Sequence, residues 1–263
     1  MQKTVQTVYH SSQPLHKHSH FHDCHQIILV VRGTVEFCVN DRHINASDGD
    51  IAIFSRYENH SVCNCSEEYE RYVLHIDPDV VNQKSPVYSL LTDRPAGFCN
   101  VLNISSCKGE IIGLFKRMIV EHNSQARFSD ELEQLLVKQL LVMVYRSTTV
   151  TFNSTYDDVV ADLKRQFENN CQIHYHLDNL ARKYSISPSS LSHRFQAATG
   201  VSVMEYLQSC RMANAKQLLA DTHLSIGQIV ERCGFSDNSN FSRAFKKMTG
   251  VSPSAFRKQY KAR

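Results

Sequence analysis

The sequence predicts an α+β protein in which a β-rich part precedes an all-helical part. Short segments rich in Val, Ile and Phe alternate with Gly and Asp turns at the start. Apolar residues at helical spacing follow, and one helical pattern occurs twice near the end. We therefore expect an arm and a small barrel over 1–106, a helical hairpin over 107–147, a linker over 148–155 and a bipartite helical unit over 156–263.

The expected barrel begins with QIILVV at residues 26–31 and continues through TVEFCVN, RHINASDGD, DIAIF and RYVLHID. Polar and apolar residues alternate from Thr34 to Val39, which is typical of a half-buried strand. Short strands joined by tight turns predict a closed barrel or a two-sheet jelly roll. Residues 1–16 are polar and show no period, so we expect them to form an arm that folds over the barrel.

Two amphipathic segments, 109–123 and 129–147, predict the helical hairpin. Ser129 is the expected cap of the second helix. The apolar stripe of this helix comprises Leu132, Leu135, Leu136, Gln139, Leu140 and Met143. The stripe can pack on the barrel, or it can also meet a second copy of the chain in a homodimer, and both alternatives stay open at this point.

The two halves of the chain differ in charge. Residues 156–263 hold 15 Lys and Arg against 9 Asp and Glu, whereas the first 155 residues are net acidic and hold ten of the fourteen histidines. A basic helical unit suits a polyanionic partner. No apolar run approaches the roughly 18 residues of a membrane span, so we expect a cytoplasmic protein with no membrane partner.

The nine cysteines are odd in number and scattered, which predicts reduced thiols rather than a disulfide framework. Cys63 and Cys65 form the one close pair in the sequence. A thiolate metal site needs further ligands at suitable spacing, and none are obvious nearby. We expect ordinary buried thiols, and a thiol sensor built on Cys63 and Cys65 is an alternative.

A helical pattern at residues 185–204 returns at 234–253. The closing TGVS motifs align at an offset of 50, and the apolar residues upstream align at 49. Each copy is expected to form a short helix, a tight turn and a second helix capped by serine, which is a helix-turn-helix. The serines that match are Ser187 and Ser236. The turn holds Gly234 in the second copy and Ser185 in the first, where it makes the turn costlier.

Polar residues on the outward face of the second helices differ between the copies, whereas the apolar anchors are kept. This is expected of two helices that read different bases, because Asn pairs with adenine and Arg with guanine, while lysines neutralise phosphates. The long helix over 202–222 is expected to hold the reading helices apart, since successive major-groove segments lie about 34 Å apart. The expected DNA-contacting residues are Ser189, Ser192, His193, Arg194, Arg211, Asn238, Ser239, Ser242, Arg243, Lys246 and Lys247.

The segment SIGQIVERCGFSDNSNFSRAFKKMTGVSPSAFR, at residues 225–257, closely resembles the signature of AraC/XylS-type transcription regulators. The resemblance covers about 156–262 and implies a bipartite domain that binds double-stranded DNA at promoters. It also implies regulation of transcription, with activation as our expectation, and contact with RNA polymerase.

The front part resembles the cupin-type sensor domain of that family. HSHFHDCHQIILVVRG places His20, His22, Gln26 and Gly33 at the spacing of the first cupin motif, and GDIAIFSRYENHSVCN places Gly49, His60 and Asn64 at the spacing of the second. Ser55 and Tyr57 stand where the motif usually has Pro and Gly.

The resemblance implies a small-molecule effector site lined by His20, His22, Gln26 and His60, and a sugar or sugar derivative is the expected effector. The same residues are the set that would hold a metal, but Gln26 replaces an anionic ligand, so we expect neither metal nor cofactor. We expect no catalytic residues. Histidines with a purely structural role are one alternative, and a metal-dependent cupin enzyme fused to a DNA-binding unit is another.

Overall fold

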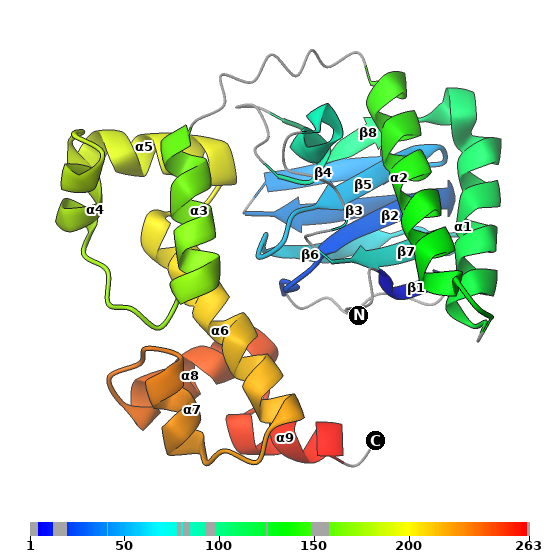
Figure 1. The fold of residues 1–263 in the computed structure, drawn as a ribbon. Coiled ribbons are helices and arrows are strands. Elements are labelled where there is room, and N and C mark those ends of the chain that lie inside the picture. Colours follow the sequence, from blue (N-terminus) through cyan, green and yellow to red (C-terminus); the bar gives the residue numbers. More distant parts are fainter. Residues whose placement is uncertain are drawn as a thin grey trace. The chain divides into compact units, whose positions relative to one another are not determined.

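The computed structural model describes residues 5–12, 20–40, 42–77, 80, 85–92, 98–124, 126–148 and 158–261. The chain separates into two compact units, residues 1–155 and 156–263 (Figure 1). The first unit is β-rich and ends in a helical hairpin, and the second is helical, so the predicted α+β fold class is confirmed. The expected linker, except Thr148, lies outside the described residues.

The described part of the first unit contains two antiparallel sheets, with strand orders β1-β7-β2-β5-β8 and β4-β3-β6. The strands are β1 (Val5–Ser11), β2 (His25–Arg32), β3 (Thr34–Val39), β4 (Arg42–Ser47), β5 (Asp50–Phe54), β6 (His60–Cys65), β7 (Glu70–Ile76) and β8 (Val101–Asn103). The helical segments are η2 (Pro86–Leu90), η3 (Ser105–Cys107), α1 (Lys108–His122) and α2 (Ser129–Ser147).

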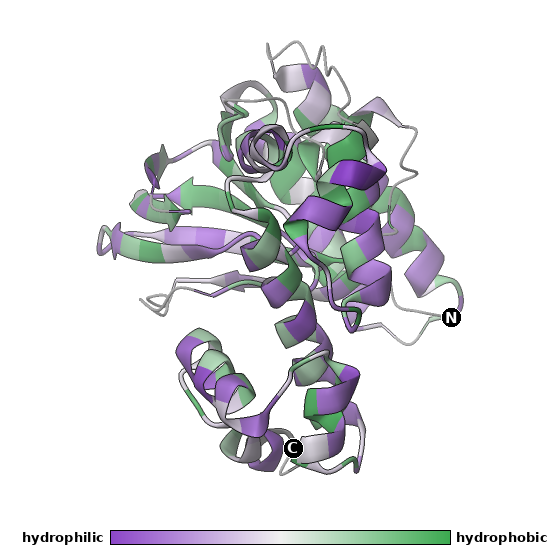
Figure 2. Ribbon diagram, turned by 90° about the vertical axis from the view of Figure 1, so that its left-hand side faces the viewer, coloured by the Kyte–Doolittle hydropathy of each residue, from purple (hydrophilic) through white to green (hydrophobic). Residues whose placement is uncertain are grey.

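The five-stranded sheet is buried on both faces. Along β2, Ile27 and Leu29 join the core formed with the hairpin helices, whereas Ile28 and Val30 join the core shared with the three-stranded sheet. Figure 2 shows green and purple segments alternating along strands. Successive side chains of such a strand enter two different cores, so its sequence is a continuous apolar run. This explains QIILVV.

Residues 5–11, expected to belong to an arm, form strand β1 and pair with β7. The expectation of an arm was therefore wrong for these residues. The strand was not evident in the sequence because the register shifts between Val5 and Thr7, so the buried residues Val5 and Val8 lie three positions apart and show no period of two. Residues 1–4 and 13–16 of the expected arm lie outside the described residues.

The hairpin covers the outer face of the five-stranded sheet (Figure 1). Leu136 and Leu140 are buried in this core, which confirms that the stripe packs on the barrel, but Leu135 remains 62% exposed. Ser129 does not cap α2, because Phe128 occupies the cap position with a φ of 70° and the Ser129 hydroxyl donates to Glu121 instead.

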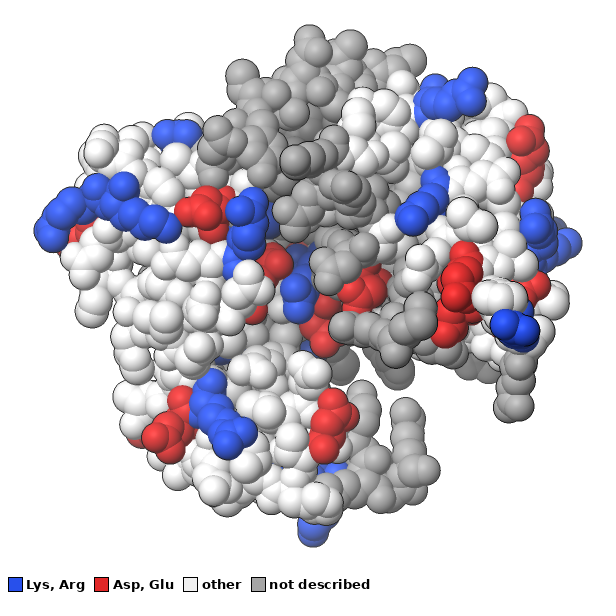
Figure 3. Space-filling view, in the orientation of Figure 1, with Lys and Arg blue, Asp and Glu red and all other residues white. Residues whose placement is uncertain are grey.

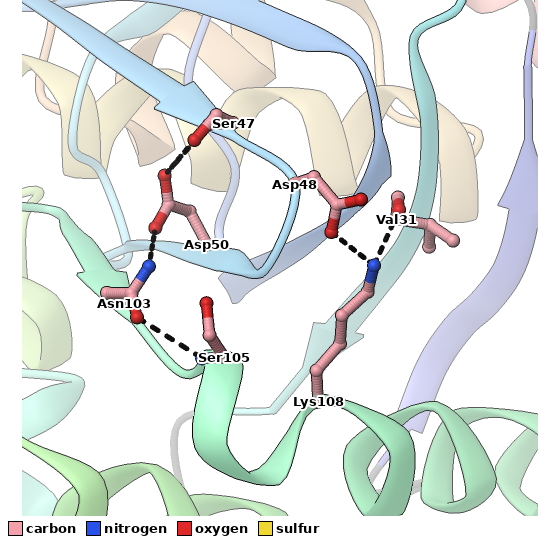
Figure 4. A network of polar contacts seen from close by, with 7 residues as sticks. All are labelled: Val31, Ser47, Asp48, Asp50, Asn103, Ser105 and Lys108. Carbon is pink, nitrogen blue, oxygen red and sulfur yellow. Dashed lines mark hydrogen bonds and ion pairs between the residues drawn. The ribbon is translucent and has the colours of Figure 1, made fainter.

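A polar network ties the start of this hairpin to the barrel (Figure 4). Lys108 at the first turn of α1 donates to the carbonyl of Val31 over 2.9 Å and pairs with Asp48. The Asp50 carboxylate accepts from Ser47 and from the Asn103 side chain, at 2.8 Å each. The turn between β4 and β5 is therefore joined both to β8 and to α1.

The second unit contains α3 (Asp158–Asn170), α4 (Leu177–Lys183), α5 (Pro188–Thr199), α6 (Val203–Asp221), α7 (Ile226–Arg232), α8 (Asn238–Thr249) and α9 (Pro253–Lys261). The two copies of the sequence pattern correspond to α4 with α5 and to α7 with α8, and α6 connects them. Among the described residues, none of the helices has the length and apolar composition required to cross a membrane.

Candidate sensor site and DNA-binding interface

Strand alternation places a polar layer at one end of the barrel interior. Gln26 precedes Ile28 by two residues, His75 follows Val73 by two, and His60 precedes Val62 by two, and each of these apolar residues belongs to the core between the sheets. Side chains two apart on a strand share a face. Gln26 and His75 are also cross-strand partners on β2 and β7. The three polar side chains therefore extend the apolar interior.

His20 and His22 complete this layer from the segment before β2. His20 and His60 exchange two backbone hydrogen bonds of 2.9 Å, which align the segment with β6. The ring centroids of His20 and His60 lie 4.6 Å apart, and those of His22 and His75 lie 4.7 Å apart. The structure thus brings together all four predicted ligand-binding residues and adds His75.

Hydrogen bonds fix the tautomers of two of these rings. The Nδ1–H of His60 donates to the carbonyl of Glu58 over 2.9 Å, so its Nε2 holds a lone pair. The Gln26 amide donates to Nε2 of His75 over 2.9 Å, and Nδ1 of His75 bonds to Thr7 over 2.6 Å. Burial lowers the pKa of His60 to about 3 and that of His75 to about 4, so both rings are neutral at pH 7.

Two buried acceptors of this layer, His60 Nε2 and Gln26 Oε1, have no hydrogen-bond partner among the described residues. The His60 ring stacks on Phe54, with centroids 4.2 Å apart and planes inclined by 7°. Ligand atoms of His20, His22 and His60 lie within 4.8 Å of one another. Three imidazoles at this separation, with the Gln26 oxygen, have the donor chemistry for a divalent transition metal as well as for an organic ligand.

Tyr57 adopts a φ of 63° in the left-handed region. The resemblance places this residue where glycine is usual, and the backbone there indeed takes a conformation that glycine adopts without cost. The Tyr57 N–H donates to the carbonyl of His22 over 2.9 Å, so this strained turn also positions the histidine segment.

His75 was not singled out from the sequence. It lies on β7 among apolar residues. Its spacing of two from Val73, and its alternation with Leu74 and Ile76, place its side chain on the interior face between the sheets. That alternation was available in RYVLHID as a signal.

In the second unit, both copies of the pattern form a helix-turn-helix. The turn residues Ser185 and Gly234 have φ values of 56° and 73°. The reading helices α5 and α8 both end at a glycine in the left-handed region, Gly200 and Gly250. The threonine before each glycine closes the end with a side-chain bond to the carbonyl four residues earlier.

The caps of the reading helices differ from the expectation. Ser187 caps α5 by accepting from the Ser190 N–H over 3.1 Å, but Asp237 rather than Ser236 caps α8, with a distance of 2.7 Å to the Asn240 N–H. The one-residue change of offset therefore falls inside the turn, after the left-handed residue and before the cap, and the expectation of Ser236 as cap was wrong.

The predicted base-reading residues lie mostly on the exposed faces of α5 and α8. Leu191 and Phe195 of α5, and Phe241 and Phe245 of α8, are the buried anchors. The exposed residues among the predicted set are Ser189, His193, Asn238, Ser239, Arg243, Lys246 and Lys247, and the half-buried ones are Ser192, Arg194 and Ser242.

Asn240 is a residue of this surface that the sequence reading missed. Its amide oxygen accepts from the Arg243 guanidinium over 2.5 Å, and its own amide bonds to Asp237. The signal was its spacing of three from Arg243 on one helix face. Asn240 orients the arginine that we expect to read bases.

Arg211 of α6 is engaged inside the unit. Its Nε donates to the carbonyl of Cys171 over 2.8 Å and its Nη2 to that of Ile173 over 2.9 Å, while the guanidinium lies 5.8 Å from the centre of the Phe235 ring. The loop after α3 is thus tied to α6 and to the turn of the second copy. A phosphate contact by Arg211 stays a prediction and would use its remaining N–H groups.

On the face drawn in Figure 3, Lys and Arg side chains are scattered among Asp and Glu rather than gathered in one patch. The net positive charge of residues 156–263 therefore does not form a single basic patch on the face drawn there. The described basic residues of α8, Arg243, Lys246 and Lys247, lie together on one exposed helix.

Two family models match this chain. The AraC-like ligand binding domain matches residues 4–141, and the Helix-turn-helix domain matches residues 180–259. The HTH-type transcriptional activator RhaR of Escherichia coli O6:H1 is 26% identical over 249 residues, which are 90% of this chain and 86% of RhaR. The Arabinose operon regulatory protein of Salmonella typhimurium is 33% identical over 145 residues, which are 55% of this chain and 52% of that protein.

Solved structures show the same fold. ToxT from Vibrio cholerae gives a TM-score of 0.64 at 15% identity, with 97% of this chain and 98% of ToxT covered. ToxT with bound unsaturated fatty acid gives 0.62 at 15% identity, with 98% and 97% covered. Because the ligand-binding model matches more than half of the chain and is followed by the helix-turn-helix match, this chain belongs to the AraC family of transcription regulators, with a ligand-binding unit and a DNA-binding unit.

Proposed function

We propose that this protein activates transcription in response to a hydroxyl-rich small molecule, a sugar or sugar derivative, held by His20, His22, Gln26 and His60. The observation that carries the proposal is the pair of buried acceptors, His60 Nε2 and Gln26 Oε1, that have no partner among the described residues. An unsatisfied buried group costs about 1–3 kcal/mol, and ligand hydroxyls that donate to both atoms remove that cost. The neutral rings of His60 and His75 offer no positive charge to an anion.

The similarity to an Arabinose operon regulatory protein supports a sugar as the effector class. The test is a thermal shift of the full chain with a panel of neutral sugars, fatty acids and divalent metals. A sugar is expected to raise Tm in the natural protein and in Gln208→Leu, an exposed control on α6, but not in Gln26→Leu or His60→Phe. A shift with fatty acids or metals alone would contradict the sugar assignment.

For DNA, we propose that α5 and α8 enter successive major-groove segments and read bases through Ser189, Ser192, His193, Asn238, Ser239, Ser242 and Arg243. Lys246, Lys247 and Arg194 are proposed phosphate contacts. Selection of bound genomic fragments at one fixed salt concentration tests this, because salt alone changes affinity by orders of magnitude. Paired matching half-sites are expected, and an absence of binding even at low salt would overturn the proposal.

We also propose a homodimer formed through α2. Leu135 and Val142 lie seven residues apart on one helix face and are 62% and 42% exposed, although their neighbours are buried against the barrel. Leu135→Glu is expected to convert the dimer to a monomer in light scattering. Met204→Glu, a change at a 45%-exposed apolar residue of the DNA-binding unit, is the control and should leave the dimer intact.

A regulator of this family acts where the chromosome lies, so we propose a cytoplasmic location and contact with RNA polymerase. In vitro transcription from a selected site tests activation directly, and repression by the bound protein would reverse that part of the proposal. We propose no catalytic activity, because the named relatives of this chain are transcription regulators.

A further inference from the structure

A second group of metal-binding side chains lies on the outer face of the three-stranded sheet. Cys38, His43 and Cys63, from β3, β4 and β6, each offer one ligand atom, and these atoms lie within 4.8 Å of one another. Both cysteines are half-buried and free of disulfides, and the His43 side chain is 60% exposed. The sequence reading paired Cys63 with Cys65, whereas the structure pairs it with ligands that come from neighbouring strands.

Strand pairing accounts for this group. Cys38 and His43 are direct cross-strand partners on β3 and β4. Val35, Phe37 and Val39 face the core between the sheets, so the alternating position Cys38 faces outward.

Cys63 follows the core residue Val62 and so lies on the same outer face, at an irregularity in β6. The pairing of β3 with β6 changes from Phe37–Val62 to Glu36–Asn64, which leaves Cys63 as the extra residue of a β-bulge. A bulge redirects a side chain, and bulges are common next to functional sites. Val62 enters the core, and Cys63 beside it joins Cys38 on the outer face.

Glu36 supports the imidazole of this group. Its Oε1 lies 3.0 Å from Nδ1 of His43, and the carboxylate is 35% exposed. A carboxylate that accepts one ring proton of a histidine orients the ring and leaves the other nitrogen with the lone pair that a metal needs. Two thiols, an imidazole and a supporting carboxylate form the donor set typical of zinc.

We propose that Cys38, His43 and Cys63 bind one Zn²⁺ ion, with water in the fourth position and Glu36 holding His43. Coordination by two thiolates releases the two thiol protons to solvent. The ion links β4 to β6 across β3, so it stabilises the folded sheet by an amount that grows with the logarithm of the ratio of free Zn²⁺ to its dissociation constant. The site lies on the opposite side of the three-stranded sheet from the core residues, and it does not depend on the effector proposed for the histidine layer.

The test is a titration of the reduced, metal-free full chain with Co²⁺, followed by displacement with Zn²⁺. One Co²⁺ per chain is expected, with the thiolate-to-cobalt charge-transfer absorption and the strong visible bands of tetrahedral cobalt. Cys38→Ser, Cys63→Ser and His43→Gln are expected to abolish the charge-transfer signal or weaken binding severely. Glu36→Gln is expected to weaken it about 10–100-fold.

Two matched variants separate this site from its rivals. Cys65→Ser, two residues along the same strand, and His22→Gln, in the interior layer, are expected to keep full binding and the same spectrum. Binding that survives Cys38→Ser but is lost in His22→Gln would assign the metal to the histidine layer and overturn the proposal. Failure of the reduced chain to bind Co²⁺ or Zn²⁺ would overturn it as well.

Discussion

Ser185 and Gly234 occupy the same position in the two turns, and both have a positive φ, at 56° and 73°. A residue with a Cβ is strained in this conformation by about 1–2 kcal/mol, whereas glycine is not. The second position also leaves no room for a side chain, because a Cβ at Gly234 would lie 2.4 Å from the carbonyl oxygen of Gln172. The same backbone requirement therefore has different consequences in the two copies.

Ser185→Gly is expected to raise the free energy of unfolding by about 1 kcal/mol, since it removes the strain and leaves the turn intact. Gly234→Ala is expected to lower it by more than Gly250→Ala does, because Gly250 has a φ of 78° but nothing within 4 Å of an added Cβ. Urea unfolding of the four proteins checks this order. Equal losses for the two alanine variants would contradict the close approach of Gln172.

His75 provides a residue-scale prediction about pH. Its pKa falls from 6.5 to about 4 on folding, chiefly because burial disfavours the charged ring. Between these values the unfolded chain binds more protons, so the free energy of unfolding decreases as the pH drops through this window, by up to about 3 kcal/mol. His75→Gln is expected to flatten this decrease in unfolding experiments, and His223→Gln, at an exposed position, is expected to retain it.

At the scale of elements, α8 separates two kinds of DNA contact on one surface. Arg243 is held by Asn240 and is the proposed base-reading residue, whereas Lys246 lies in the last turn and is a proposed phosphate contact. The two residues should therefore respond differently to DNA sequence and to salt.

Arg243→Ala is expected to cost about 1–3 kcal/mol at the cognate site and to relax specificity at one base. Lys246→Ala is expected to weaken binding to all sequences alike and to reduce the slope of log K against log salt by about 1. Binding isotherms on cognate and scrambled DNA at several salt concentrations measure both effects. If Lys246→Ala instead lost its preference for the cognate sequence, Lys246 rather than Arg243 would be the base-reading residue.

The hairpin shows why an apolar stripe does not specify its own partner. Leu136 and Leu140 are buried against the sheet, and Leu135, from the same stripe, is exposed. Helical spacing predicts which residues share a face, but the width of the face that becomes covered depends on the sheet beneath it. The element was predictable from the sequence, and its division into a buried and an exposed part was not.

At the scale of the whole molecule, the two helix-turn-helix copies are joined by more than α6. Arg211 bonds to carbonyls of the loop after α3 and lies over Phe235 in the turn of the second copy. The carbonyl of Gln172, in the same loop, packs against Gly234. Arg211 and Gln172 therefore connect the loop that precedes the first copy to the turn of the second copy.

Arg211→Met is expected to weaken binding to a complete half-site about 10-fold, or about 1.4 kcal/mol, because the two copies then lose their fixed spacing. Binding to DNA that contains only one of the two reading segments should change little, and Gln217→Ala on the same helix is the control. If Arg211 instead neutralises a phosphate, the salt slope should fall by about 1 on every sequence. Salt titrations on both DNAs distinguish the two roles.

From local spacing alone one can predict the order of a β-rich unit and a helical unit, the duplicated helix-turn-helix and a set of candidate DNA-facing residues. These features depend on neighbours within one helix or one strand, and local spacing encodes them. Local spacing does not reveal that residues 5–11 join the sheet, that His75 completes the layer with Gln26, or that Cys63 lies beside Cys38 and His43. Those contacts depend on strand register and bulges between segments far apart in the chain, where a shift of one residue exchanges the two faces of a strand.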